Sequence, residues 1–286
     1  MENQVKSSDA AITVSCRAVR WQVLPEEKDL LGALQTLRFD QVEGFPGLRL
    51  LKLDDGLFWG HLRVGEKDYF IKGRKQDRFR RIVKSLFRAS KLREEWRKTW
   101  WLKSRGIETV EPVAIGEVRW MGALLESFLV TRWIPEARNL LEYMEEKEKL
   151  LSTRAFEGLR KCVVFFLGRL FGSLHVLGVF HRQFHDRNIL VVEANDATPR
   201  LLPIDLDHLT IFKGFREEDR DWNFYQLAWH LRRPISRFKP GPKDVVQFLK
   251  GYHQAAPQSA ADLKALVWRM KAVLPPEPLL ERPKRN

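Results

Sequence analysis

Two short polar clusters contain the kinds of residue that bind a metal ion. The stretch between them predicts a tight hairpin. The first cluster is HRQFHDRN at residues 181–188, and an apolar run at 189–192 follows it. After a turn-rich, Pro-containing segment, a second apolar run leads into Asp205. Apolar runs on both sides of such a turn indicate a hairpin, which would bring Asn188 close to Asp205. Amide and carboxylate oxygens are donors that Mg²⁺ accepts.

A pair of oxygen ligands suits phosphoryl transfer, in which an enzyme holds ATP, Mg²⁺ and an acceptor hydroxyl in line and neutralises the developing charge. The catalytic loop of kinases has the pattern H-x-D-x-x-x-x-N. The chain matches it at His181 and Asn188 but has Gln183 where the catalytic Asp is expected. Gln cannot accept a proton, although its amide oxygen can orient a hydroxyl. General-base help is typically worth ~10²–10⁴-fold, so its loss need not abolish transfer.

Two neighbouring side chains are candidates to replace the missing base. Asp186 follows Gln183 by three positions, but a turn or cap role explains it equally well. For His185 a structural role is the better explanation. Singly, Asn188 could be a turn residue and Asp205 a strand-end carboxylate, whereas their combined pattern and spacing favour catalysis.

A segment upstream of these clusters contains Lys72, the residue predicted to bind the phosphates of ATP. Residues 48–72 alternate as three antiparallel strands do, and Lys72 ends the third. Kinases place a phosphate-binding Lys in a third strand, where a carboxylate from the next helix holds it. Residues 90–104 predict that helix, with Glu95 as the partner of Lys72 and Glu94 as the reserve. The alternative is that both glutamates pair with basic neighbours on the helix surface.

The order of elements predicts an α+β chain with two lobes and flanking segments. Residues 1–44 would form an N-terminal extension, and residues 45–132 a small β lobe with one helix. Residues 133–275 would form a helical lobe that holds the catalytic loop, and residues 276–286 a loose, Pro-rich tail. One helix is expected to run straight into the loop. The helices of this lobe are expected near residues 139–149, 153–178, 219–231, 244–252 and 260–273.

Composition indicates a globular protein of a reducing compartment. Of the 286 residues, 44% are hydrophobic and 11% aromatic, which allows a substantial core. Cys16 and Cys162 are too few for a disulfide framework. Residues 162–180 approach the length of a membrane span, but Arg169 near their middle is costly in lipid, so they predict a buried helix. With no visible signal peptide, we expect a cytoplasmic protein.

Positive charge is concentrated in one part of the chain. The net charge is +13, and residues 74–105 hold thirteen basic residues against three acidic ones. Such a segment attracts nucleic acid, anionic lipid headgroups or phosphorylated sugars. No RNA-binding aromatic signature accompanies the basic segment, so nucleic acid is the least favoured partner.

Together these pieces resemble the lipopolysaccharide core heptose/Kdo kinase family, a bacterial branch of the protein-kinase-like fold. The resemblance covers about residues 45 to 255. It implies a bilobal protein-kinase-like fold with a small antiparallel β lobe and a larger helical lobe. The motifs that carry it are YFIK at 69–72, REEW at 93–96, SRGIETVEPVAIGE at 104–117, HRQFHDRNILV at 181–191, PIDLDH at 203–208 and FLKGY at 248–252.

The resemblance also implies roles for single residues. Lys72 would bind the α- and β-phosphates of ATP, oriented by Glu95. Asn188 and Asp205 would hold Mg²⁺, and His181 would brace the loop. The implied substrate is an anionic glycolipid or phosphosugar of the lipid A–core region, phosphorylated on the cytoplasmic side of the inner membrane. Residues 74–105 would then make peripheral contact with that membrane surface.

Three functions follow from these observations. The favoured one is an ATP-dependent kinase that phosphorylates a sugar hydroxyl of a lipopolysaccharide core or related envelope glycolipid. A pseudokinase that binds or regulates without turnover is the second, because Gln183 and the glycine-poor loop at 54–60 favour it. A small-molecule kinase of the aminoglycoside or choline type is the third, because His185 also suits that pattern.

Overall fold

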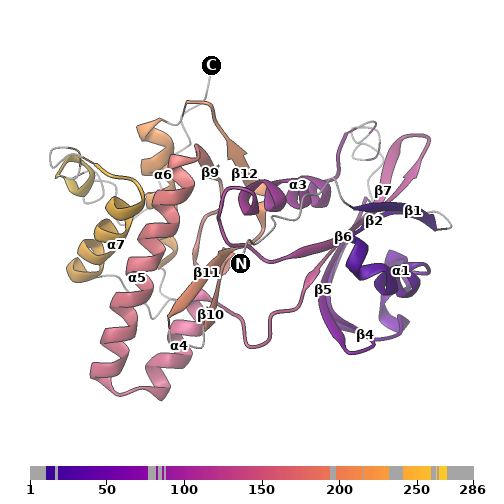
Figure 1. The fold of residues 1–286 in the computed structure, drawn as a ribbon, viewed down its shortest axis with the longest axis horizontal. Coiled ribbons are helices and arrows are strands. Elements are labelled where there is room, and N and C mark those ends of the chain that lie inside the picture. The colour runs from indigo at the N-terminus through magenta and orange to yellow at the C-terminus, as the bar shows by residue number, and fades with distance from the viewer. Residues whose placement is uncertain are drawn as a thin grey trace. The chain divides into compact units, whose positions relative to one another are not determined.

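The computed structural model consists of two compact units, Met1–Pro135 and Glu136–Asn286 (Figure 1). The boundary falls in the segment after residue 132, near the predicted division between the lobes. The residues that the structure describes are 11–16, 19–76, 82, 86, 88–193, 198–214, 216–231, 241–258, 262 and 264–268.

Unit 1 is built on a seven-stranded antiparallel sheet with the order β1-β2-β6-β7-β5-β4-β3. Strands β3 to β5 are the predicted meander. Residues 12–44, treated above as an extension, contribute β1, β2 and the helix α1 (Lys28–Leu34) to this unit. The strands are β1 (Ile12–Cys16), β2 (Val19–Val23), β3 (Leu48–Asp54), β4 (Leu57–Val64), β5 (Lys67–Lys75), β6 (Pro112–Trp120) and β7 (Ala123–Arg132).

Aromatic rings lie over glycines in the core of unit 1. Trp21 on β2 stacks on Phe128 of β7 with 5.8 Å between ring centroids. The Trp21 ring also covers Gly116 so closely that a Cβ there would lie 2.7 Å from it. At the edge of the sheet, the pairing of β3 with β4 shifts between Leu50 and Lys52, which marks a β-bulge.

Helix α3 (Lys91–Lys103) packs on β6 and β7 of the same unit. Its start is set by Ser90, whose Oγ accepts a hydrogen bond of 3.0 Å from the backbone N–H of Arg93. Gly106, at φ +77°, follows its end. The predicted helix over residues 90–104 is therefore confirmed.

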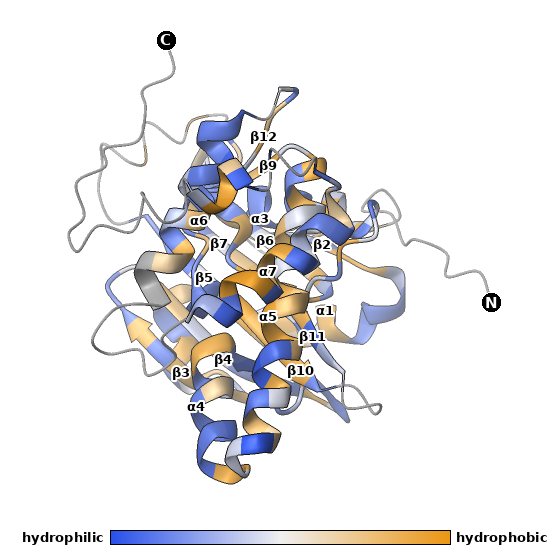
Figure 2. Cartoon of the chain, turned by 90° about the vertical axis from the view of Figure 1, so that its left-hand side faces the viewer, coloured by the Kyte–Doolittle hydropathy of each residue, from blue (hydrophilic) through white to orange (hydrophobic). Residues whose placement is uncertain are grey.

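Unit 2 is mainly helical. Figure 2 shows hydrophobic segments on both α5 and α7, and these two helices approach very closely at glycines. A Cβ on Gly172 would lie 2.7 Å from the carbonyl oxygen of Tyr252. Among the described residues, no helix combines the length and apolar character needed to span a bilayer. The helices are α4 (Leu140–Leu150), α5 (Thr153–Val176), α6 (Glu217–Leu231) and α7 (Pro242–Ala255).

Three short strands in unit 2 form the predicted hairpin and its neighbour. β10 (Ile189–Glu193) pairs with β11 (Pro199–Pro203), and β8 (Arg138–Asn139) pairs with β10. The prediction that a helix runs straight into the loop is wrong. α5 ends at Val176, and the chain then forms β9 (Val179–His181), which pairs with β12 (Leu209–Ile211). Strands of three residues are too short to show an alternation that differs from a helical pattern.

Some predicted features fall on residues that the structure does not describe. Of the predicted helix at 260–273, only residues 262 and 264–268 are described, and these are helical. The predicted tail at 276–286 lies outside the described residues, as does most of 77–87 within the basic segment.

Candidate functional site

The hairpin of β10 and β11 brings the two predicted metal ligands to the same end of the pair. Ile189 pairs with Pro203, so Asn188 precedes one strand and Asp205 follows the other. The backbone N–H of Ile204 donates a hydrogen bond of 3.0 Å to the carbonyl oxygen of Asn188. The predicted proximity of these two segments is therefore present in unit 2.

Hydrogen bonds inside the loop link three of the predicted residues. The side-chain amide of Asn188 donates to the carbonyl oxygen of Gln183 at 2.9 Å. The backbone N–H of Gln183 in turn donates to Nδ1 of His181 at 3.2 Å. With its amide nitrogen used in this way, Asn188 has its Oδ1 as the atom that can bind a cation.

His181 is a buried, neutral histidine at the start of the loop. Burial lowers its pKa to about 4, against the opposing effect of the Asp205 charge. Because Nδ1 accepts the hydrogen bond from Gln183, the neutral ring carries its proton on Nε2. The ring stacks on Phe184 with 5.3 Å between centroids. These contacts suit a residue that braces the loop.

A buried amide on α6 holds the loop in place, and the sequence interpretation missed it. The Nδ2 of Asn223 donates to the carbonyl oxygen of His181 at 2.7 Å, and its Oδ1 accepts from the His181 N–H at 3.5 Å. The same Oδ1 lies 3.3 Å from Nε2 of His175 on α5. The only available signal was a polar residue between the apolar positions Trp222 and Phe224 of a predicted helix.

Asp205 adopts a left-handed backbone conformation, with φ 58° and ψ 46°. Non-glycine residues rarely hold this conformation, and such strain gathers at functional sites. The side chains of Asp207 and His208 lie close by, and one ligand atom from each of the three residues falls within 4.8 Å of the others. Carboxylate oxygens and the Asn188 Oδ1 fit Mg²⁺, whereas a histidine nitrogen is not one of its usual ligands.

The two candidates for the catalytic position differ in exposure. Gln183 is exposed, whereas Asp186 is buried as the first residue of a short 3₁₀ turn, Asp186–Asn188. Nδ1 of His185 lies 3.8 Å from the Asp186 carboxylate. Because an acceptor hydroxyl must reach the catalytic group, the burial of Asp186 favours its structural role.

In unit 1, the predicted pairing of Lys72 with Glu95 is present. Lys72 Nζ lies 3.1 Å from Glu95 Oε2, and the two side chains are only 13% and 10% exposed. The reserve candidate, Glu94, instead lies 3.5 Å from Arg97 on the exposed side of α3. α3 therefore directs one glutamate to the sheet and the other to the surface. β5 continues past Lys72 to Lys75, so the expectation that Lys72 ends the third strand is wrong. A Lys held in this way offers a fixed positive charge within β5.

Comparison with known proteins adds the family. The model of the family described as "Lipopolysaccharide kinase (Kdo/WaaP) family" matches residues 58–252. Comparison with curated proteins gives no match.

Two solved structures are similar in fold. "WaaP in complex with acyl carrier protein" is 21% identical, with a TM-score of 0.57 over 88% of this chain and 97% of that one. "Crystal structure of aminoglycoside-3'-phosphotransferase of type VIII" is 16% identical, with a TM-score of 0.52 over 86% of this chain and 98% of that one. At these identities the likeness shows the fold alone, and it agrees with the predicted protein-kinase-like class.

Proposed function

The chain belongs to the lipopolysaccharide kinase (Kdo/WaaP) family, and from this we propose that it transfers phosphate from ATP to a sugar hydroxyl of a lipopolysaccharide core or related envelope glycolipid. The observation that supports the proposal most is the nearly buried Lys72–Glu95 ion pair at 3.1 Å. A surface lysine would pair with any exposed acid nearby. A shielded lysine held by one glutamate is the arrangement that binding of phosphate oxygens requires.

The proposed roles follow from the charge and donor type of each residue. The Lys72 ammonium binds the α- and β-phosphates, and Glu95 keeps it extended toward them. The oxygens of Asn188 and Asp205 would hold Mg²⁺, which when bound would supply positive charge to neutralise the phosphates. His181 and Asn223 keep the loop that carries Asn188 in one conformation.

Gln183 takes the place of the catalytic aspartate in this proposal. Gln183 is exposed, and its amide oxygen accepts a hydrogen bond from the acceptor hydroxyl and orients it toward the γ-phosphorus. The hydroxyl proton passes to solvent as the new bond to phosphorus forms. Transfer should then be slower by about 10²-fold than with a carboxylate, because general-base help is worth ~10²–10⁴-fold.

The basic segment fits the anionic character of the proposed substrate. Of residues 74–105, the described part includes exposed Lys91 and Arg97 on α3. A positive surface of this kind favours peripheral contact with anionic headgroups on the cytoplasmic side of the inner membrane. The relative named above was solved with an acyl carrier protein, so such a protein is a second candidate partner for this segment.

The test is an assay of phosphate transfer from labelled ATP, with Mg²⁺, to detergent-solubilised deep-core lipopolysaccharide. We expect transfer by the unchanged protein and loss of it in Asp205→Ala. Glu95→Gln should also lose most activity, whereas its neighbour Glu94→Gln is the matched control and should retain it, because Glu94 pairs with Arg97 at the surface. Equal losses of activity in the two glutamate variants would contradict the role proposed for the Lys72–Glu95 pair.

A pseudokinase is the second candidate function. Gln183 favours it, and so does the turn between β3 and β4, which is only two residues long and has Gly56 as its one glycine. Binding of Mg²⁺-ATP without turnover on any glycolipid or small alcohol would support this alternative. A strong rise in rate for Gln183→Asp would instead show an active kinase that lacks an efficient base.

A further inference from the structure

The end of the β6–β7 hairpin extends beyond the strands on either side of it. β2 pairs with β6 as far as Val118, and β5 pairs with β7 as far as Glu126. Gln76, just after β5, still donates to the carbonyl oxygen of Leu125 at 2.8 Å. Beyond it, the described strands pair within the hairpin, with Trp120 opposite Ala123. Two large apolar side chains occupy this end, because Trp120 is 66% exposed and Met121 is 79% exposed.

The turn has a backbone that does not suit its first residue. Met121 and Gly122 both have positive φ, at 47° and 84°. A two-residue hairpin turn of this kind ordinarily has Asn or Gly first, because those residues tolerate the left-handed region. Met121 therefore occupies a strained position while it is almost fully exposed. Strain of this kind points to a use outside the fold.

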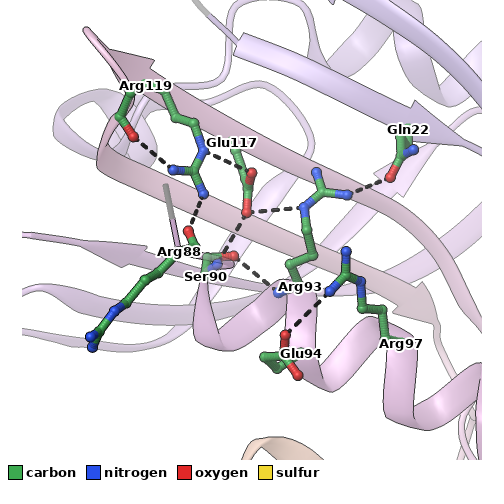
Figure 3. Close-up of polar contacts among 9 residues, drawn as sticks. Gln22, Arg88, Ser90, Arg93, Glu94, Arg97, Glu117 and Arg119 are labelled. Atoms are coloured by element: carbon green, nitrogen blue, oxygen red, sulfur yellow. Dashed lines mark hydrogen bonds and ion pairs between the residues drawn. The ribbon is translucent and has the colours of Figure 1, made fainter. Parts of the chain in front are cut away.

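Hydrogen bonds fasten the hairpin end to the start of the basic segment (Figure 3). The Arg119 guanidinium donates to the carbonyl oxygen of Gly122 at 2.9 Å and to that of Arg88 at 2.6 Å. It also donates to Glu117 at 3.2 Å, and Glu117 pairs with Arg93 of α3 at 3.1 Å. The turn is thus held rigidly beside the residues that precede α3.

The surroundings of the two apolar side chains are positively charged. Residues 88–98 contain five basic residues and two acidic ones, and one of those acids, Glu95, pairs with Lys72. Arg88 and Lys91 are exposed, and Figure 3 shows the Arg88 side chain extending away from the Glu117 network. The hairpin end therefore combines an apolar tip with a basic flank.

This combination fits a lipid surface better than a protein. Trp is enriched where membranes meet water, and basic side chains near that surface bind anionic lipids. A stable protein interface buries about 800 Å² on each partner, far more than two side chains provide. We propose that Trp120 and Met121 insert into the headgroup region of an anionic bilayer, with Arg88 and Lys91 against the lipid phosphates. The inference rests on the proposed function, because it names the residues that would reach the membrane.

Vesicle binding by the full-length protein tests the proposal. Sedimentation is measured with vesicles of phosphatidylcholine alone and of phosphatidylcholine mixed equally with phosphatidylglycerol. The variant is Trp120→Ser with Met121→Asn, since Asn suits the turn and should keep the hairpin folded. We expect binding to the mixed vesicles and a loss of at least about tenfold in affinity in the variant, because two apolar side chains lose their burial. Trp268→Ser is the matched control, as Trp268 is 71% exposed elsewhere in the chain.

The outcomes separate this proposal from the one on which it rests. Unchanged vesicle affinity in the double variant, or equal binding to both vesicle types, would overturn the inference. Preserved phosphate transfer to detergent-solubilised substrate, together with lost vesicle binding, would support it. If the protein without substitutions binds vesicles through Trp120 and Met121 but transfers no phosphate, that result would contradict the proposed function and leave the membrane proposal standing.

Discussion

The two units use glycine for close packing in different ways. In unit 1, Gly116 makes room for the ring of Trp21, and Gly73 does the same for Phe58. In unit 2, Gly168 and Gly251 let the backbones of α5 and α7 meet, and a Cβ on either would overlap a carbonyl oxygen of the other helix. A ring can tilt to admit a methyl group, whereas two packed helices can separate only as whole elements. Unit 2 should therefore tolerate added volume less well.

The units also bury different kinds of polar groups. Unit 1 buries carboxylates beside cations. Burial alone would raise the pKa of Glu27, but hydrogen bonds from Tyr69 and Lys67 and the charge of Arg132 outweigh it and lower that pKa. Unit 2 also buries a carboxylate beside a cation, Asp244 with Arg160, but in addition it buries neutral histidine. Burial lowers the pKa of His175 to about 3, and its ring lies 3.1 Å from the hydroxyl of Tyr252.

The largest expected effect is that of Gly251→Ala. The added methyl group would overlap the carbonyl oxygen of Phe165, so we expect unit 2 to lose about 3 kcal/mol or more. Gly116→Ala, whose methyl group would meet the ring of Trp21 first, should cost unit 1 about 1–2 kcal/mol. Denaturant unfolding followed by hydrogen exchange resolves the two units. If Gly251→Ala lost no more stability than Gly116→Ala, the expectation that unit 2 tolerates added volume less well than unit 1 would be wrong.

Mild acid should weaken unit 2 before unit 1. His175 and His181 have pKa values near 3 and 4 when folded but about 6.5 when unfolded, so the unfolded chain binds more protons between these values. Their stabilisation is therefore present above pH 6.5 and falls as the pH drops, by about 2 kcal/mol for each histidine at pH 5.

The carboxylates of unit 1 respond in a lower pH range. The pKa values of Glu27 and Glu117 are lowered from 4.5, so their stabilisation persists until the pH approaches that value. Hydrogen exchange corrected for its intrinsic pH dependence, measured from pH 7 to 4, should show unit 2 opening first. Simultaneous opening of both units would contradict this prediction.

A somewhat smaller effect is expected from Asn223→Ala. The change leaves the backbone N–H and carbonyl of buried His181 without this partner, which should cost unit 2 about 1–2 kcal/mol. Because the same contacts hold the loop, phosphate transfer should fall more than stability explains. Asn223→Asp is the control, since a carboxylate has the shape of the Asn223 amide but lacks the N–H group that donates to the His181 carbonyl oxygen. Full phosphate transfer by Asn223→Ala would show that the catalytic loop keeps its conformation without Asn223.

The smallest effect is expected from Glu27→Gln in unit 1. Glu27 accepts a hydrogen bond from Tyr69 and pairs with Lys67 and Arg132, both of them partly exposed. We expect a loss of about 1 kcal/mol, because water screens the two cations. Thermal unfolding at pH 7 measures it. A loss as large as that of Gly251→Ala would mean that unit 1 depends on buried charge more than on ring packing.

Local patterns predicted those parts of the fold that rest on neighbours in sequence. Strands β3 to β5 have seven to nine residues each, long enough to show alternation, and Ser90 marked the start of α3. The Lys72–Glu95 contact followed because a strand and the next helix carry its two ends. The roles of these residues in catalysis remain predictions.

Contacts between distant segments could not be predicted. Residues 18–24 have a strand-like pattern, but β2 pairs with β6, which lies far away in sequence, so nothing local indicated its partner in the sheet. Asn223 binds the backbone of His181, and a backbone partner leaves no residue type to recognise. The turn at Met121 could not be predicted either, because the usual two-residue hairpin turns have Asn, Asp or Gly in the first position and not Met.

The bulge in β3 bears on how the protein avoids aggregation. β3 is an edge strand, with Leu51 and Leu53 exposed at 47% and 41%. A straight, apolar edge would invite strand addition from a second chain. The shift between Leu50 and Lys52 interrupts the regular backbone spacing, and the charged Lys52 stands beside it. A straightened β3 would keep the same sheet but would expose it to edge-to-edge assembly into fibres.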